Sequence, residues 1–259
     1  MVALLEIKNL TKKFGGLTAL EQLDLDVEQG EILGVIGPNG AGKTTLFNII
    51  TGFLQPTRGR VIFQNENING LKPHTRAKKG IIRTFQLTDL FGDFTVLDNM
   101  HIGFHLQSQI GLVKAKISRN PECLKEEEIE RKSIEILNLV GMDHLKDKPA
   151  KDLSHGYHKS LAVAIALAAN PQLLLLDEPV TSLNPERVAA MMGLIRKMRE
   201  RGVTIVLIEH NMKTIFGVCD KIVVLDHGIK IAEGLPDEIR TNKNVIAAYL
   251  GNKADITKS

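Results

Sequence analysis

The chain has 259 residues, 43% hydrophobic and 24% charged, so it is long enough and apolar enough to bury a sizeable core. Its 33 basic and 30 acidic residues nearly balance, and because no long block of like charge stands out, we expect no nucleic-acid partner. The first residues lack an export-signal pattern and the apolar runs are too short to span a bilayer, so we expect membrane association to be peripheral.

The strand signals are of two kinds. Leu5 to Ile7 and Leu23 to Val27 alternate apolar with polar side chains, which is typical of half-buried strands. Ile32 to Ile36 is continuously apolar and predicts a parallel strand covered on both faces, as do Leu173 to Leu176 and Val203 to Ile208. Helix-like segments link these continuous runs, so we expect an α/β fold with two sheet environments.

A glycine-rich motif of the form GxxxxGK[ST] separates the predicted strand Glu31 to Ile36 from a helix that begins near Lys43. Glycines let backbone N–H groups point inward, the helix N-terminus attracts an anion, the lysine reaches the β- and γ-phosphates, and the threonine ligates Mg²⁺. We therefore predict a site for a purine nucleoside triphosphate; the plainer interpretation is a turn that merely joins a strand to a helix. The predicted cradle consists of Gly37, Pro38, Asn39, Gly40, Ala41, Gly42, Lys43 and Thr44.

Helical periodicity replaces the strand signals between about Gln86 and Ala168, which indicates a helical insertion. Within it, Lys125 to Val140 has a charged face that we interpret as solvated, with pairs such as Glu128 and Lys132.

The final part of the chain predicts a hairpin and then a helix. Lys221 to Asp226 and Ile229 to Glu233 flank the turn His227-Gly228. We expect a helix from Pro236 to about Leu250, followed by a frayed tail over 252–259.

Two adjacent carboxylates, Asp177 and Glu178, follow the buried run Leu173 to Leu176. Ligands bind at this carboxyl edge in open α/β sheets, so we assign Asp177 to the Mg²⁺ shell and Glu178 to the general base that polarises a water. The alternative is an ordinary acidic helix start. His210 ends another buried run; contact with a γ-phosphate is geometrically reasonable, but capping or packing would explain it as well.

The order of these motifs resembles the ATP-binding-cassette (ABC) ATPases over nearly the whole chain. That resemblance implies a P-loop NTPase fold with a RecA-like mixed sheet core, an antiparallel β subdomain and a helical signature subdomain. In this single domain, 1–85 and 169–251 would form the nucleotide-binding core with its β subdomain, and 86–168 the helical subdomain. The motifs that carry it are Gly37 to Thr45, Gln86, Leu153-Ser154-His155-Gly156, Asp177-Glu178, Ser182 to Pro185 and His210.

The resemblance also implies roles for single residues, with ATP and Mg²⁺ as ligands. Phe14 looks like the aromatic that stacks on adenine, although strand-end packing would also explain it. Gln86 matches the glutamine that touches Mg²⁺ and the attacking water. Ser154 and Gly156 match the signature, which in this family contacts the γ-phosphate bound by the opposite subunit. The implied metal ligands are Thr44, Gln86 and Asp177, the implied catalytic groups are Glu178, His210 and Gln86, and Thr45 extends the nucleotide-binding set.

Further segments resemble the ATPase subunits that serve branched-chain amino-acid uptake. This implies an importer subunit at the cytoplasmic face of the membrane, working with permease subunits, a second ABC ATPase subunit and, indirectly, an extracytoplasmic solute-binding protein. Residues near Leu87 to Asn99 should meet a coupling helix of the permease. The segments are Leu17 to Leu20, Arg83 to Gln86, Leu90-Phe91, Thr95 to Asn99, Ile208 to Met212 and Lys221 to Gly251.

The signature departs from the family pattern. This chain has His155-Gly156-Tyr157 where the family usually has Gly or Tyr followed by Gly-Gln, and Ile165 replaces a usual arginine. Because similar ATPases serve permeases for urea, amides or aromatic acids, we expect the solute to be a branched-chain amino acid or a related small polar molecule.

Two other functions compete with transport. An ABC ATPase acting on ribosomes or DNA usually carries tandem cassettes or coiled coils, and this chain has one cassette without a heptad stretch. A nucleotide kinase or GTPase would share only the phosphate cradle, and the chain lacks an Asn-Lys-x-Asp guanine motif.

Overall fold

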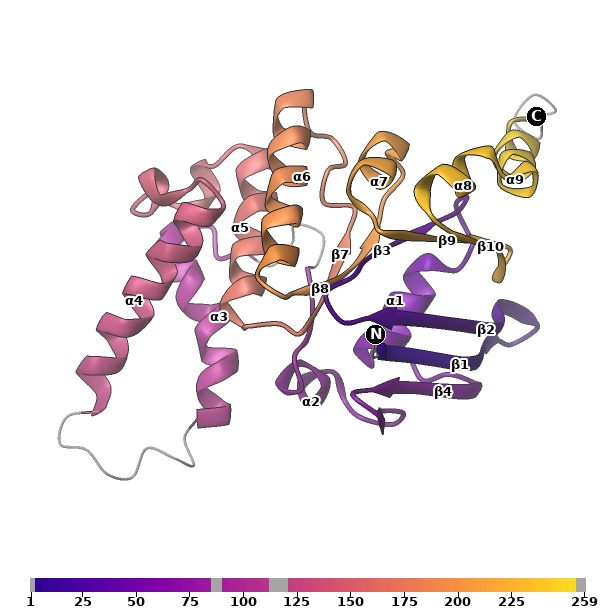
Figure 1. Ribbon diagram of the computed structural model, residues 1–259. Coiled ribbons are helices and arrows are strands. Elements are labelled where there is room, and N and C mark those ends of the chain that lie inside the picture. The colour runs from indigo at the N-terminus through magenta and orange to yellow at the C-terminus, as the bar shows by residue number, and fades with distance from the viewer. Residues whose placement is uncertain (1–2, 85–89, 112–120, 255–259) are drawn as a thin grey trace.

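The computed structural model describes residues 3–84, 90–111 and 121–254. In these residues the strands form two sheets (Figure 1). The first is antiparallel in the order β2-β1-β4-β5, and the second is mixed in the order β10-β9-β3-β8-β7-β6. The strands are β1 (Ala3–Phe14), β2 (Leu17–Glu28), β3 (Ile32–Ile36), β4 (Arg58–Phe63), β5 (Glu66–Asn67), β6 (Ile81–Arg83), β7 (Leu173–Asp177), β8 (Thr204–Ile208), β9 (Lys221–Asp226) and β10 (Ile229–Gly234).

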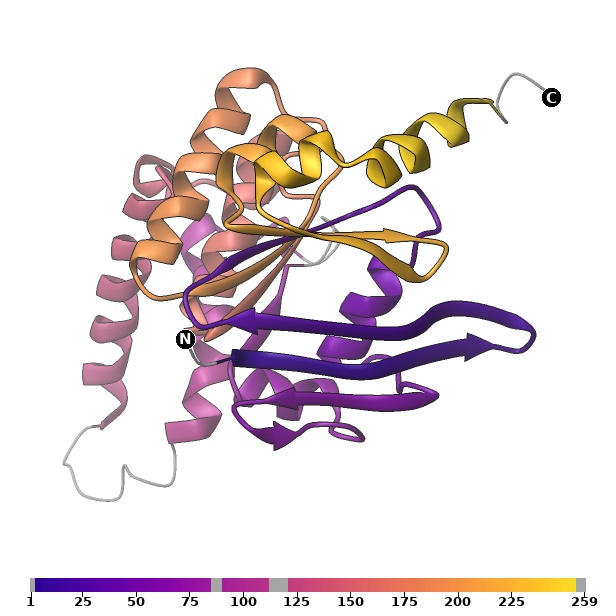
Figure 2. The same ribbon diagram turned by 45° about the vertical axis from the view of Figure 1, so that its right-hand side comes forward.

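Helices cover the mixed sheet on both faces. In both views α1 lies between the two sheets, while α6 and α7 lie on the opposite face of the mixed sheet (Figures 1 and 2). The helices are α1 (Lys43–Thr51), α2 (Pro73–Lys78), α3 (Val96–Gly111), α4 (Pro121–Leu139), α5 (His155–Ala168), α6 (Pro185–Glu200), α7 (Met212–Val218), α8 (Pro236–Thr241) and α9 (Lys243–Ala254).

The continuously apolar segments form the buried centre of the mixed sheet, as predicted. Strands β3 and β8 are buried along their whole length, and β7 is buried up to Leu176. They pair in parallel, so their carboxyl ends meet at one edge of the sheet. The expected α/β class, with two sheet environments, is confirmed.

Strands β1 and β2 are much longer than the alternating segments that predicted them. Asn9 and Gln22 have positive φ angles of 51° and 46°, and the register between the strands shifts between Ile7 and Leu10. Such bulges insert an extra residue and reverse the side-chain alternation. The alternation of apolar and polar residues is therefore interrupted at the bulge, although the strand continues beyond it.

The C-terminal helix is divided in the structure. Asn242 is extended between α8 and α9, and its side-chain oxygen accepts a hydrogen bond from the Asn244 N–H at 2.9 Å. An asparagine in this position caps a new helix, which explains the division. The expected tail is also too long, because α9 continues through Ala254.

Helices α3, α4 and α5 form a cluster of their own beside the mixed sheet (Figures 1 and 2). Helix α5 joins the two parts. Its residues Val163 and Ala166 pack in the core that covers the mixed sheet, while Leu161, Ala164 and Ala168 pack with α3 and α4. The C-terminal half of α5 is thus packed against both parts, and the signature segment lies at the other end of the same helix.

Candidate functional site

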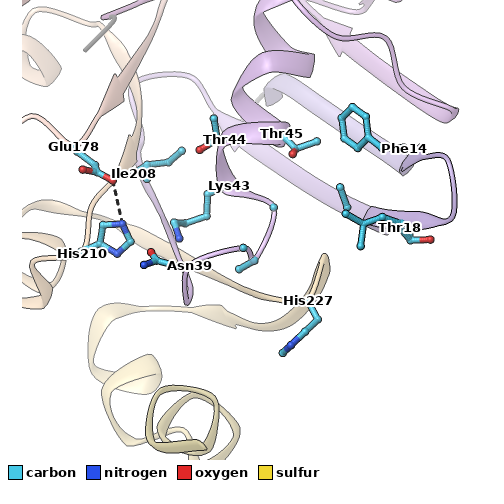
Figure 3. Close-up of a pocket in the computed structure, with 15 residues that line it drawn as sticks. Phe14, Thr18, Asn39, Lys43, Thr44, Thr45, Glu178, Ile208, His210 and His227 are labelled. Atoms are coloured by element: carbon cyan, nitrogen blue, oxygen red, sulfur yellow. Dashed lines mark hydrogen bonds and ion pairs between the residues drawn. The ribbon is translucent and has the colours of Figure 1, made fainter. Parts of the chain in front are cut away.

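A cleft of about 410 Å³ opens at the carboxyl edge of the mixed sheet (Figure 3). Phe14 and Thr18 lie at one end, Lys43 lies in the middle, and Glu178 and His210 lie at the other end. Of the predicted site residues, those lining the cleft are Phe14, Asn39, Gly40, Ala41, Gly42, Lys43, Thr44, Thr45, Glu178 and His210.

The loop between β3 and α1 has the predicted strand-loop-helix form. Gly42, at the N-terminus of α1, has φ 101°, and a Cβ there would lie 2.6 Å from the carbonyl oxygen of Ala19. Only glycine fits this conformation and this close approach. The loop therefore packs directly on β2, with the first turn of α1 facing the cleft (Figure 3).

The ammonium group of Lys43 is held inside this loop. Its Nζ donates to the carbonyl oxygens of Gly37 at 2.7 Å and Pro38 at 2.9 Å. Burial lowers the pKa of Lys43, while the carboxylates of Glu178 and Asp177 oppose that shift. A buried cation beside a helix N-terminus is suited to bind an anionic ligand.

The Glu178 carboxylate meets His210 across the end of the cleft. Oε1 of Glu178 lies 3.1 Å from Nε2 of His210 (Figure 3). Oε2 of Glu178 accepts a hydrogen bond from the Thr181 hydroxyl at 3.3 Å. Both side chains are partly exposed, at 24% for Glu178 and 42% for His210. A carboxylate and an imidazole in contact at an open cleft can together accept and hold a proton.

Asp177 does not line the cleft itself. Its Oδ2 accepts a hydrogen bond from the Arg83 guanidinium at 2.6 Å, and both side chains are about nine-tenths buried. Arg83 also donates to Asn48 of α1 at 2.6 Å. Arg83 was named only as part of the segment Arg83 to Gln86, and its pairing with Asp177 was not predicted, because one arginine at the end of a three-residue strand gives no local signal of its partners.

Phe14 stands at the exposed end of β1. Its ring is 45% exposed, and the Lys12 ammonium lies 4.8 Å from the ring centroid. The ring is not packed into a strand-end core, so it is open to stack on a planar group.

The signature segment lies outside this chain's own cleft. Ser154 is exposed at the N-cap of α5, and Gly156 follows in the first turn. The unusual Tyr157 stacks under Arg187 of α6, whose guanidinium carbon is 3.8 Å from the ring centroid. Ile165 is half-buried against the α3, α4 and α5 cluster, so the departures at Tyr157 and Ile165 are accommodated by packing, whereas His155 is exposed.

Some predictions fall outside the described residues. Gln86 is among them, as is the start of the expected permease contact at Leu87.

Over the described ranges, we found no group of three or more His, Cys, Asp and Glu side chains arranged to hold a metal ion. No helix in the part of the chain that the structure describes is both long and apolar enough to cross a bilayer.

The chain matches two family models and a series of transport proteins. The family described as "ABC transporter" matches residues 20–181, and "Branched-chain amino acid ATP-binding cassette transporter" matches residues 230–255. The high-affinity branched-chain amino acid transport ATP-binding protein BraF of Pseudomonas aeruginosa is 39% identical, covering 96% of this chain and 98% of its own. The corresponding protein LivG of Salmonella typhimurium is 37% identical over the same shares.

Solved structures agree with the sequence matches. The ADP conformation of an ATP-binding cassette of an ABC transporter has a TM-score of 0.85 at 31% identity, covering 97% of this chain and 100% of that one. A dimeric ATP-binding cassette bound to ADP and Pi has a TM-score of 0.74 at 27% identity, covering 90% and 98%. These comparisons confirm the predicted fold, a P-loop α/β cassette with a mixed and an antiparallel sheet. The chain belongs to the ABC transporter family as one of its nucleotide-binding ATPases, which couple ATP hydrolysis to transport.

Proposed function

We propose that this chain is the ATP-hydrolysing subunit of an importer for branched-chain amino acids. The observation that carries the hydrolytic part is the contact of Glu178 with His210 in the same cleft that holds Lys43. The solute assignment is supported by the names of the relatives BraF and LivG and by the family match over residues 230–255. A ribosome- or DNA-acting ATPase is not favoured, since those relatives are transport proteins.

The positions of the side chains along the cleft support a separate role for each group in nucleotide binding and hydrolysis. Phe14 would stack on the base, and the loop Gly37 to Thr45 with Lys43 would hold the phosphates. Glu178 would take a proton from the attacking water, and His210 would orient that carboxylate and contact the γ-phosphate.

The available oxygen donors fit Mg²⁺, which prefers hard oxygen ligands. The Thr44 hydroxyl lines the cleft beside Lys43, and the carboxylate of Asp177 lies at the end of β7. We propose that Thr44, Asp177 and Gln86 hold the ion. When bound, Mg²⁺ would neutralise phosphate charge; without it, Lys43 and the helix N-terminus remain to orient the phosphates.

The position of the signature supports a working dimer. Ser154 and Gly156 lie outside the cleft of their own chain, at the N-terminus of a 14-residue helix. We propose that they contact the γ-phosphate held by a second chain, which is either another copy or a related subunit. A relative of solved structure is a dimer bound to ADP and Pi.

A pair of exposed aromatic rings supports contact with a permease. Phe91 and Phe94 are 53% and 51% exposed, and their rings stack with centroids 5.4 Å apart. Exposed apolar clusters mark contact surfaces. We propose that this segment receives a coupling helix of the permease at the cytoplasmic face of the membrane, with an extracytoplasmic protein delivering the solute.

Replacing Glu178 by glutamine tests the hydrolytic part. A general base contributes about 10²- to 10⁴-fold, so Glu178→Gln should lower ATP turnover by about that factor while leaving the nucleotide Kd within about twofold. Glu31→Gln is the matched control, because Glu31 is a largely buried carboxylate at the amino end of β3, away from the cleft. Unimpaired turnover in Glu178→Gln would remove the proposed role.

A further inference from the structure

The backbone that carries Glu178 adopts a conformation that needs support. Glu178 has φ 49°, and Ser182, four residues later, has φ 65°. Left-handed backbone at non-glycine residues is unfavourable and persists only where neighbouring groups enforce it. Because the Glu178 carboxylate is placed by this loop, whatever enforces the loop also sets its distance to His210.

One enforcing group is the carboxylate of Glu209, which precedes His210. Glu209 is only 1% exposed. Its Oε1 accepts a hydrogen bond from the Val180 N–H at 2.7 Å, and its Oε2 accepts one from the His210 N–H at 3.1 Å. One side chain therefore connects the backbone on both sides of the Glu178–His210 contact.

The second enforcing group is Lys159, which comes from the signature helix α5. Its Nζ donates to the carbonyl oxygens of Glu178 at 2.7 Å and of Thr181 at 2.6 Å. Glu209 thus binds an N–H group of the loop and Lys159 binds its carbonyl groups. These backbone groups are not paired in a helix or a strand, so they need side-chain partners. Glu209 and Lys159 provide them.

Both side chains lose part of their hydration on burial, so each depends on neighbouring groups to keep its charge. Burial raises the pKa of Glu209, opposed by the N–H groups of Val180, Asn211 and His210 and by Lys159. Burial lowers the pKa of Lys159, opposed by the carboxylates of Glu209 and Glu178. Glu209 is the more deeply buried of the two, and removing Lys159 takes away a cation that favours its charged form.

We propose that Glu209 and Lys159 are positioning residues that hold the Glu178 carboxylate against His210. Neither side chain lines the cleft, so neither touches the nucleotide; they act through the loop. Because Lys159 belongs to α5, the signature helix is hydrogen-bonded to the backbone of Glu178, the proposed general base of the same chain. This inference rests on the proposed function of Glu178.

Glu209→Gln is the sharpest perturbation because it keeps the size of the side chain. Its amide nitrogen cannot accept a hydrogen bond, so the N–H groups on one side of the carboxylate, either that of Val180 or those of His210 and Asn211, lose their acceptor. A displacement of about 1 Å in a reacting group can cost about 10²-fold. We expect kcat to fall about 10- to 100-fold with KM and the nucleotide Kd within about twofold, while Glu31→Gln retains normal turnover.

Lys159 provides a second test that does not depend on Glu209→Gln folding well. Lys159→Arg keeps a cation with several donors and should retain most of the turnover. Lys159→Met keeps the apolar stem and removes the donors, so kcat should fall about 10- to 100-fold with an unchanged Kd.

The outcomes separate this proposal from the one it rests on. If Glu178→Gln abolishes turnover but Glu209→Gln and Lys159→Met hydrolyse ATP at the rate of Glu31→Gln, the positioning roles are wrong and the function of Glu178 stands. If Glu178→Gln itself turns over normally, the proposed function has failed. Equal losses in Lys159→Arg and Lys159→Met, or losses confined to Kd, would also overturn the positioning role.

Discussion

Adding one methyl group at Gly42 should destabilise the protein more than the same change two residues earlier at Gly40. Both glycines have positive φ, 101° at Gly42 and 81° at Gly40, so alanine at either position pays about 1–2 kcal/mol for its backbone conformation. The surroundings differ. A Cβ at Gly40 meets nothing within 4 Å, whereas one at Gly42 lies 2.6 Å from the Ala19 carbonyl oxygen and 2.8 Å from Cδ2 of Leu20.

The overlap at Gly42 sets the expected difference. Overpacking of this kind costs about 1–3 kcal/mol, so Gly42→Ala should lose about 2–5 kcal/mol in total and Gly40→Ala about 1–2 kcal/mol. The entropy that alanine removes from the unfolded chain is the same in both variants and cancels from the comparison.

Urea denaturation of both variants beside the parent chain measures this difference directly. The midpoints should separate while the m-values stay equal, because the change affects the native state and not the extent of unfolding. Equal free energies of unfolding for the two variants would refute the claim that close packing of the phosphate loop on β2 demands a glycine at Gly42.

Three further predictions concern charged side chains. Lys43→Met removes the ammonium from the cleft, and because hydrogen bonds to a charged group contribute about 1.5–3 kcal/mol, fluorescent-nucleotide titration should show at least about tenfold weaker binding; an unchanged Kd would contradict the cradle. Arg83→Met leaves the buried Asp177 without its counter-charge and should lower the free energy of unfolding by about 3–5 kcal/mol in urea, whereas a loss below about 1 kcal/mol would contradict the pairing. Burial raises the pKa of Glu31 above its ordinary 4.5, so the folded state binds more protons than the unfolded state just above that pH. The parent chain should therefore lose stability relative to Glu31→Gln as pH rises from about 4.5 through the raised pKa, and a pH-independent difference in urea titrations would refute this.

Local sequence was enough to predict the parts of the site that depend on adjacent residues. The loop Gly37 to Thr44 lies between β3 and α1 as expected, and Glu178 and His210 lie in one cleft because their strands are parallel neighbours. Continuous apolar strands and a compact motif carry this information within a few residues.

The groups that support the site could not be predicted in the same way. Arg83, Lys159 and Glu209 each bind atoms far away in the chain, or backbone groups whose position depends on the loop conformation. A lysine in a helix or a glutamate at a strand end is ordinary in sequence, and only tertiary packing reveals its burial. The full length of β1 could not be predicted for a related reason. The bulge at Asn9 interrupts the apolar–polar alternation, and that bulge is defined by the pairing of β1 with β2.

ATP-driven leucine uptake into vesicles tests the hydrolytic role of Glu178 and the proposed solute in one experiment. The full chain would be reconstituted with the permease with which it co-purifies and the cognate solute-binding protein, with ATP on the side of the ATPase. We expect the parent chain and Glu31→Gln to accumulate labelled leucine and Glu178→Gln not to, although all three bind ATP equally. Leucine accumulation by Glu178→Gln at the parent rate, or none by the parent chain while it hydrolyses ATP, would contradict it.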